Sequence, residues 1–445
     1  MSERLYWDEN IETASDEELR PMLTDRLRKQ VRYVYERSPL YRRKLAEAGI
    51  EPGDIHQLED LYRIPFTTKD EIRRTQEEWP PLGQHMCVPM TEVIRVHASS
   101  GTTGRPSFVG LTRHDLFVWN EVMARAFWAQ GARPGEPAWD ACTLGFWVAG
   151  VGFLDALEHL GAPVLPAGGS EPARAFAVAQ AARARFIIST PSFISYLTDF
   201  AHQQLGLDPS TIGIANIGLG GEPGAGTPVF REKMEREWGA NVYDCMGTAD
   251  YMPVVWSECC KKGGMHFLGQ GFVIPEVVDP ETGKHLEIKK GLVGELVYTA
   301  IDRECVPLMR FRIGDLVAVL DDSTCDCGRT SFRIRCIDRA DNMLLVQAVN
   351  VFPSAIIDVI STLAPRVTGE AQLLLDKPGP KVDPPVKIRA EHGDEPGDLA
   401  ELKEIIESLL REKLIFRADV ELVPPATLRK GTMKRQIVRR LYLEK

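Results

Sequence analysis

The chain has 445 residues, a formal net charge of −10, 44% hydrophobic residues and 26% charged residues. This length accommodates two or three domains with a large buried core. The negative charge argues against nucleic acid or an anionic membrane as the main partner, but it is compatible with an anionic small ligand, because loops and helix N-termini bind anions. No apolar run approaches about 18 residues and the N-terminus lacks an apolar signal core, so we expect a cytoplasmic protein.

The hydrophobic pattern predicts an α/β fold. A helix start signal at Ser15-Asp16-Glu17-Glu18 and apolar residues at helical spacing predict helix within residues 15–48. Residues 93–98 alternate as in a strand, residues 186–188 form a short apolar strand, and residues 228–238 have a helical pattern. Strands and helices alternate in this way to about residue 335, which indicates a mixed sheet layered with helices.

A change in composition near residues 338–341 predicts a domain boundary. We expect a large N-terminal domain of mixed β-sheets and helices over residues 1–338. A small, mobile α+β domain would follow over residues 339–445, with a helix near 399–413 and a basic tail from 429 to 445.

The most informative motif is Ser99-Ser100-Gly101-Thr102-Thr103-Gly104, directly after the predicted strand at 93–98. Its glycines allow the backbone to approach a ligand, and its hydroxyls and N–H groups can donate to phosphate oxygens. The motif is not a Walker loop, because no Gly-Lys-Ser/Thr ends it. Taken alone it fits a phosphate cradle and an exposed Ser/Gly/Thr turn equally well.

Four more segments carry candidate chemistry, and each taken alone also fits a turn, a capping acid or a surface ion pair. They are Gly220-Gly221-Glu222-Pro223, residues 243–250, residues 310–315 and residues 339–343. In this order and spacing, they and the Ser/Thr/Gly loop resemble the adenylate-forming enzymes, and in particular the phenylacetate–CoA ligase branch. The resemblance extends over nearly the whole chain, through residues 38–45, 64–69, 97–106, 190–192, 279–283 and 349–353.

The resemblance implies an AMP-forming ligase for an aromatic carboxylic acid, either an aryl or an arylacetic acid. The acid would attack the α-phosphate of ATP and release pyrophosphate, and the thiol of coenzyme A would then displace AMP from the acyl-adenylate. It further implies Mg²⁺ as a cofactor and a homodimer as a candidate assembly. Positioning and charge neutralisation would supply most of the acceleration in the first step.

The resemblance also assigns roles around the nucleotide. Residues 99–104 would hold the ATP phosphates. Gly221, Glu222 and Pro223 would line the adenine pocket, Asp244 would accept from the adenine amino group, and Met246-Gly247 would lie beside the ring.

Four further residues match the family's ribose, metal and hinge positions. Asp315 would accept hydrogen bonds from both ribose hydroxyls, and Asp250 would help to hold Mg²⁺. Arg339 would contact ribose or phosphate, and Asp341 would be the hinge of the small domain.

Three residues match the acid pocket: Phe146, Trp147 and Gly220. Phe146 and Trp147 lie in segment 144–150, whose aromatic and small residues suit a flat apolar ring. An ordinary core segment explains the same residues.

Cys259, His266, Cys325 and Cys327 are predicted to form a structural zinc site. Three thiolates and one imidazole are a standard tetrahedral set for Zn²⁺, and a similar pattern occurs in some phenylacetate–CoA ligase relatives. Cys260 is an alternative to Cys259. Free buried cysteines are the alternative to a metal site.

The sequence departs from the family pattern at several positions. Ala249-Asp250 stands where Ser/Thr-Glu is usual, and Gln347-Ala348 replaces Arg-Gly beside the CoA path. Thr432 occupies the position of the catalytic lysine, so Lys430 or Lys434 is the candidate replacement. Two alternatives stay open: transfer to an amine or a carrier protein, and a catalytically disabled nucleotide-binding relative.

Overall fold

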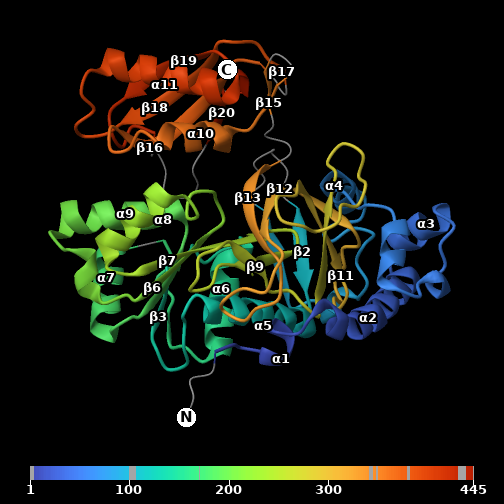
Figure 1. Cartoon of the computed structure of the whole chain (residues 1–445). Coiled ribbons are helices and arrows are strands. Elements are labelled where there is room, and N and C mark those ends of the chain that lie inside the picture. Colours follow the sequence, from blue (N-terminus) through green and yellow to red (C-terminus); the bar gives the residue numbers. More distant parts are fainter. Residues whose placement is uncertain are drawn as a thin grey trace. The chain divides into compact units, whose positions relative to one another are not determined.

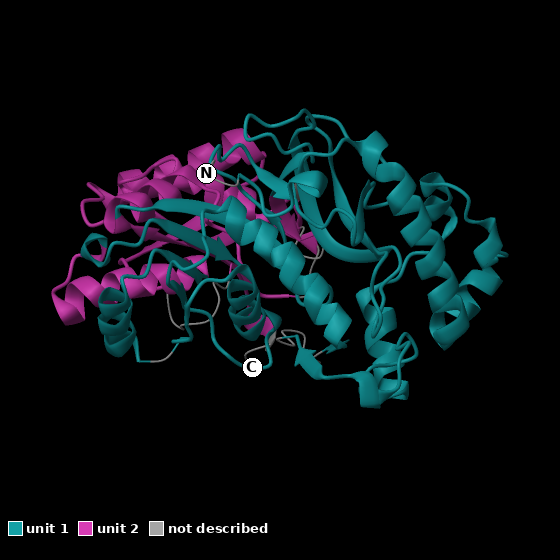
Figure 2. Cartoon of the chain, turned by 90° about the horizontal axis from the view of Figure 1, so that it is seen from below, with its two compact units in different colours: residues 1–189, 210–221, 239–335 teal, residues 190–209, 222–238, 336–445 magenta. Residues whose placement is uncertain are grey.

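The computed structural model describes residues 5–99, 107–169, 171–339, 344–346, 349–377, 381–428 and 437–443. The chain divides into two compact units (Figure 2). The first unit comprises residues 1–189, 210–221 and 239–335, and the second comprises residues 190–209, 222–238 and 336–445.

The first unit is built on one 11-stranded sheet with the order β10-β11-β12-β13-β9-β8-β7-β6-β5-β3-β4 (Figure 1). Strands β4, β3, β5, β6 and β7 are parallel, whereas β7–β8, β8–β9, β9–β13, β11–β12 and β10–β11 are antiparallel pairs. The strands are β3 (Ala138–Asp140), β4 (Val164–Leu165), β5 (Phe186–Ser189), β6 (Asn216–Gly220), β7 (Asn241–Thr248), β8 (Met252–Ser257), β9 (Met265–Phe267), β10 (Val273–Val278), β11 (Val293–Ala300), β12 (Phe311–Asp321) and β13 (Arg333–Arg339).

Helices and a two-stranded ribbon complete this unit. The ribbon pairs β1 (Arg95–Ala98) with β2 (Phe108–Leu111) in antiparallel register. The helices are α1 (Glu9–Glu12), α2 (Asp16–Arg37), α3 (Pro39–Glu47), α4 (Lys69–Glu78), α5 (Arg113–Ala129), α6 (Val148–Leu160) and α7 (Pro172–Ala182). Helix α5 lies in the core and buries ten of its side chains, including Trp119 and Phe127.

In its described residues, the second unit contains two smaller sheets and the α-helices α8, α9, α10 and α11. Its sheets have the orders β15-β14-β17 and β19-β18-β16-β20. Buried apolar residues between Leu344 and Val438 form the core of this unit, in which α10 packs against β16 and α11 against β19. The elements are α8 (Pro191–Phe200), α9 (Pro228–Trp238), β14 (Leu344–Val346), β15 (Val349–Val351), α10 (Pro353–Ser361), β16 (Val367–Leu375), β17 (Lys381–Val382), β18 (Val386–His392), α11 (Leu399–Leu414), β19 (Ala418–Val423) and β20 (Val438–Arg440).

The predicted α/β class is confirmed, and local chemistry explains the element boundaries. Ser15 caps α2 and forms a reciprocal capping box with Glu18. The expected helix over 15–48 is interrupted at Ser38, which caps the start of α3 and donates to the Gln84 carbonyl at 2.8 Å. Pro39 at the first position of α3 fits this break, because its ring suits a helix start.

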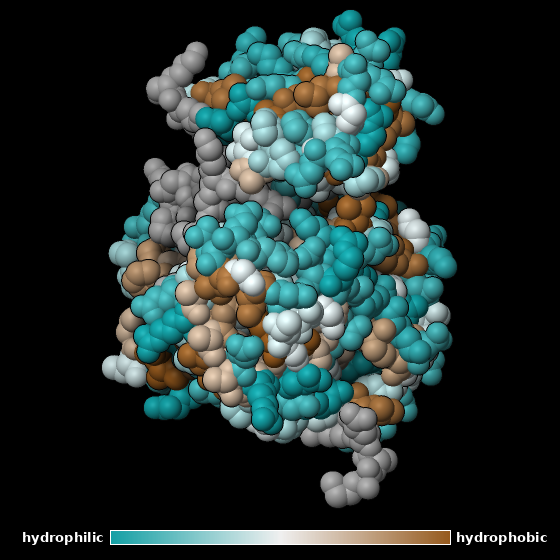
Figure 3. All heavy atoms as spheres, turned by 90° about the vertical axis from the view of Figure 1, so that its left-hand side faces the viewer, coloured by the Kyte–Doolittle hydropathy of each residue, from teal (hydrophilic) through white to brown (hydrophobic). Residues whose placement is uncertain are grey.

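Hydrophilic residues cover most of the face drawn in Figure 3, with apolar residues in small groups among them. Within the described parts of the chain, no helix is long and apolar enough to cross a membrane.

Arg310 joins residues 62–64 to the sheet of the first unit through hydrogen bonds. Its guanidinium lies 2.9 Å and 3.1 Å from the two carboxylate oxygens of Glu276 on β10, and it also donates to the carbonyls of Tyr62 and Ile64. Arg310 and Glu276 are 4% and 1% exposed. Removal of one partner from such a pair leaves the other charge buried and uncompensated.

We therefore expect Arg310→Met to lower the free energy of unfolding by about 3–5 kcal/mol, measured by urea denaturation. Arg20→Met is the matched control, because the Arg20–Glu59 pair is about half exposed and should contribute less than about 1 kcal/mol. Equal effects of the two substitutions would contradict this account.

Candidate active site

The carboxyl ends of β6 and β7 place Gly220, predicted for the acid pocket, and Asp244, predicted for the adenine pocket, on neighbouring strands. These strands are parallel, with Leu219 opposite Asp244 and Gly220 opposite Cys245. Ligands of open α/β sheets bind outside the carboxyl ends of parallel strands. The backbone of Asp244 is held by Glu258, whose carboxylate accepts from the Asp244 N–H at 2.8 Å.

Two motif glycines are required by packing between strands. A Cβ on Gly220 would lie 2.6 Å from the Cys245 carbonyl oxygen, and one on Gly247 would lie 2.2 Å from the Pro253 carbonyl oxygen. Real Cβ contacts are not this short. Glycine at both positions therefore permits the close approach of β7 to its neighbours, whatever ligand the edge binds.

The ends of the Ser/Thr/Gly loop are linked to Asp250. The Ser99 N–H donates to the Ser107 carbonyl, and the Ser107 N–H donates to Ser99 Oγ, both at 2.8 Å. Ser107 Oγ in turn donates to one carboxylate oxygen of Asp250, and Lys69 Nζ lies 2.5 Å from the other. Asp250 is 6% exposed. The Asp250 carboxylate, in the turn after β7, thus contacts both Ser107 at the end of the loop and Lys69 at the start of α4.

Sequence reasoning assigned no role to Lys69, and it placed Ser107 only at the end of the stretch from Ser99 that carries the phosphate loop. Lys69 is the first residue of α4, after the N-cap Thr68, whose side chain accepts from the Glu71 N–H. The backbone of Thr67 pairs with Arg310 and Arg312 at the start of β12. Residues 64–69 were part of the family pattern, but only the fold shows that the Lys69 ammonium group lies beside the Asp250 carboxylate.

The predicted ribose acid, Asp315, lies on β12 and is 8% exposed. In the strand order, β13, β9 and β8 separate β12 from β7. Arg339 is the last residue of β13, and its backbone N–H donates to Asp338 at 2.7 Å. Asp338 also accepts from the N–H of Ser354 at the start of α10.

Glu222 and Pro223 belong to the second unit, whereas Gly221 ends a segment of the first. The Glu222 carboxylate accepts from the Ser192 N–H at 2.5 Å, at the N-terminus of α8. Thr190 caps the same helix by accepting from the Phe193 N–H. This arrangement gives Glu222 a helix-terminal position that suits an acidic side chain.

The predicted acid-pocket residues Phe146 and Trp147 lie at the start of α6. The side chain of Phe146 is 81% exposed, while its carbonyl accepts from the Ala98 N–H at 2.9 Å. Phe146 is therefore not an ordinary core residue.

Some predicted residues lie outside the described part of the chain, and their roles stay predictions. These residues are Ser100, Gly101, Thr102, Thr103, Gly104, Asp341, Gln347, Ala348, Lys430, Thr432 and Lys434.

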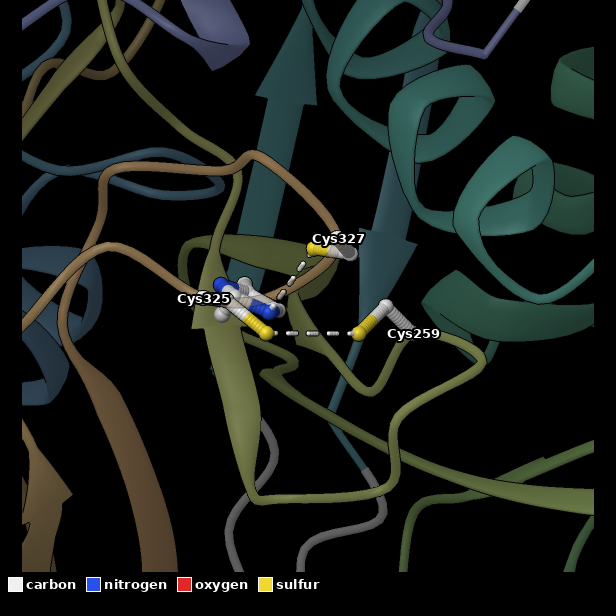
Figure 4. A group of neighbouring side chains, drawn as sticks. Cys259, Cys325 and Cys327 are labelled. Atoms are coloured by element: carbon white, nitrogen blue, oxygen red, sulfur yellow. Dashed lines mark hydrogen bonds between the residues drawn. The ribbon is translucent and has the colours of Figure 1, made fainter.

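Cys259, His266, Cys325 and Cys327 come together in one cluster (Figure 4). Their ligand atoms all lie within 4.8 Å of one another. The sulfurs of Cys259 and Cys325 are 4.0 Å apart, and Cys327 Sγ is 3.6 Å from His266 Nε2. Cys260 is exposed and is not part of this cluster.

The surroundings of the cluster suit thiolate and imidazole ligands. Ser331 Oγ lies 3.4 Å from His266 Nδ1, so the other ring nitrogen faces the sulfurs. Arg329 donates to Cys327 Sγ at 3.7 Å, and hydrogen bonds from Cys259 and His266 lower the pKa of the Cys327 thiol. Gly328, at φ +89°, makes the tight turn after Cys327. The donor set and its spacing therefore fit a tetrahedral Zn²⁺ ion.

The profile of the family described as "AMP-binding enzyme" matches residues 23–300, and that of the "AMP-binding enzyme C-terminal domain" matches residues 348–440. The chain belongs to this family. A phenylacetate–coenzyme A ligase of Thermus thermophilus is 37% identical to it, over 86% of this chain and 84% of that protein. The corresponding Escherichia coli ligase is 35% identical, over 77% of this chain and 76% of that protein. The predicted branch, an AMP-forming acid–CoA ligase of the phenylacetate–CoA ligase type, is confirmed.

A solved structure extends the similarity over the whole chain. A 2-hydroxyisobutyryl-CoA ligase in complex with 2-HIB-AMP has a TM-score of 0.90 and 28% sequence identity, and covers 100% of this chain and 94% of that one. The predicted layered α/β architecture agrees with this match.

Proposed function

We propose that this ligase activates an aryl or arylacetic acid with ATP and transfers the acyl group to coenzyme A. The principal support is the similarity to phenylacetate–coenzyme A ligases over about four-fifths of the chain. The exposed aromatic ring of Phe146, beside the strand that leads into the phosphate loop, agrees with an acid that carries a flat apolar ring. A short aliphatic hydroxy acid is the second candidate, because the 2-hydroxyisobutyryl-CoA ligase matches over the whole chain.

In this proposal the loop from Ser99 to Ser107 binds the ATP phosphates, and the edge formed by β6 and β7 binds the adenine. Asp315 accepts hydrogen bonds from both ribose hydroxyls, and Arg339 contacts the ribose or a phosphate. The charge that develops at the α-phosphate is neutralised by a lysine of the C-terminal segment, Lys434 or Lys430. Domain rotation about Asp341 would let one site serve both half-reactions while it excludes water from the adenylate.

Asp250 is proposed to help hold Mg²⁺, which supplies charge neutralisation next to the phosphates. The residues present fit this ion, since Mg²⁺ is bound through one or two carboxylates together with substrate phosphates. Ser107 and Lys69 each bind one carboxylate oxygen of Asp250 and so orient it. An oxygen that accepts one hydrogen bond still has a lone pair for a metal.

Pyrophosphate exchange into ATP tests the function. We expect exchange with phenylacetate or benzoate at a higher kcat/KM than with 2-hydroxyisobutyrate, and a thioester when coenzyme A is added. A preference for 2-hydroxyisobutyrate would replace the aromatic proposal. Exchange without a thioester would favour an amine or carrier-protein acceptor, and measurable ATP binding without exchange would favour a disabled relative.

Asp250→Asn should lower the exchange rate by roughly 10²-fold and raise the Mg²⁺ concentration for half-maximal rate, because the amide provides a weaker ligand. The matched control is Asp70→Asn, since Asp70 follows Lys69 and its side chain is 86% exposed. An unchanged Mg²⁺ dependence in Asp250→Asn would contradict the assignment.

A structural Zn²⁺ ion is proposed at Cys259, His266, Cys325 and Cys327. Metal analysis of protein purified under reducing conditions should give about one zinc per chain. Cys325→Ser should lose the zinc and lower the Tm, whereas Cys260→Ser should retain both. Protein without stoichiometric zinc would contradict the proposal.

A further inference from the structure

Two hydrogen bonds from the end of β1 converge on one carbonyl of the acid segment. The Ala98 N–H donates to the Phe146 carbonyl at 2.9 Å, and His97 Nδ1 lies 3.2 Å from the same oxygen. Ala98 is the last residue of β1, directly before Ser99. The segment expected to contact the acid is therefore attached to the strand that leads into the phosphate loop.

The chemistry of this contact fixes the tautomer of His97. A carbonyl oxygen only accepts, so a hydrogen bond at Nδ1 requires the proton on that nitrogen. His97 is 2% exposed, and burial lowers the pKa of its ring, which favours the neutral form. The ring stacks on Trp119 at a centroid distance of 5.9 Å, with an interplanar angle of 20°. His97 is thus a rigid, neutral donor.

The residues before Phe146 pack against α6. A Cβ on Gly150 would lie 2.2 Å from the Thr143 carbonyl oxygen, so the backbone at Thr143 lies directly against the first turn of α6. The backbone thus contacts α6 at Thr143 and β1 at Phe146, while Phe146 itself is 81% exposed. The carbonyl of Phe146 is therefore held in place by hydrogen bonds, and its ring is accessible to a ligand.

We propose that His97 is a positioning residue that sets the place of Phe146 relative to the end of β1, and thereby the affinity for the carboxylic acid. The inference rests on the proposed function, because it assumes that Phe146 contacts the acid. His97 itself would touch neither the acid nor ATP.

Substitutions that keep a donor at the place of only one of the two ring nitrogens test this role. In His97→Asn the side-chain amide can donate from the place of Nδ1, whereas in His97→Gln it reaches the place of Nε2. We expect His97→Gln and His97→Leu to raise the KM for the acid about tenfold, the equivalent of one lost hydrogen bond, with a smaller change in the KM for ATP. His97→Asn should restore most of the wild-type value. Wild-type KM values in His97→Gln, or equal losses in Asn and Gln, would overturn the proposal.

A double-substitution cycle with Phe146→Ala provides the second measurement. Because Phe146 is 81% exposed, this substitution removes little packing from the fold. If His97 acts through Phe146, the effects on the KM for the acid should be less than additive. Additive effects would overturn the inference. Pyrophosphate exchange by the unsubstituted enzyme separates the outcomes: no exchange with any acid refutes the proposed function, whereas exchange with additive effects refutes only the role of His97.

Discussion

The Asp250 carboxylate is the contact on which the geometry of the candidate site depends. It accepts from Ser107 through one oxygen and from Lys69 through the other. These two residues come from the far end of the phosphate loop and from the first turn of α4, which are separated along the chain. A buried carboxylate is costly unless it is paired, so the ion pair with Lys69 also helps to explain why Asp250 can be 6% exposed.

Much of the fold was predictable from local signals. The capping box at Ser15, the helix at residues 228–238 and the strand before Ser99 each depend on neighbours within a few positions. Segment 279–283 also depends on local contacts, because Asp279 accepts from the backbone of residues 281 and 282. Such signals do not say where an element ends against a distant partner. Ser38 is an example, because its hydroxyl donates to the carbonyl of Gln84, which is 46 positions away in the sequence.

The contacts of the candidate site were less predictable, because they too join residues that are distant along the chain. The spacing of the cysteines and His266 allowed four ligands to be named, but not which of Cys259 and Cys260 faces the others. Antiparallel pairing of β9 with β13 places His266 opposite Arg333, close to the turn that carries Cys325 and Cys327. The fold selects Cys259, whose sulfur lies 4.0 Å from that of Cys325, whereas Cys260 is exposed and outside the group. The pairing of Lys69 with Asp250 spans 181 positions and had no local signal at all.

The cysteine cluster also organises the N-terminal segment. Tyr6 donates to the Cys327 carbonyl at 2.7 Å, and Glu12 on α1 forms a buried ion pair with Arg329, which in turn donates to Cys327 Sγ. Glu12 and Arg329 are each charged and almost fully buried, an arrangement that is stable only while the pair is intact. The cluster thus connects residues near both ends of the first unit, and its geometry depends on side chains that carry no metal-binding chemistry. Lys69 and His97 are comparable: neither had an assigned role in the sequence, yet Lys69 pairs with Asp250 and His97 Nδ1 lies 3.2 Å from the Phe146 carbonyl oxygen.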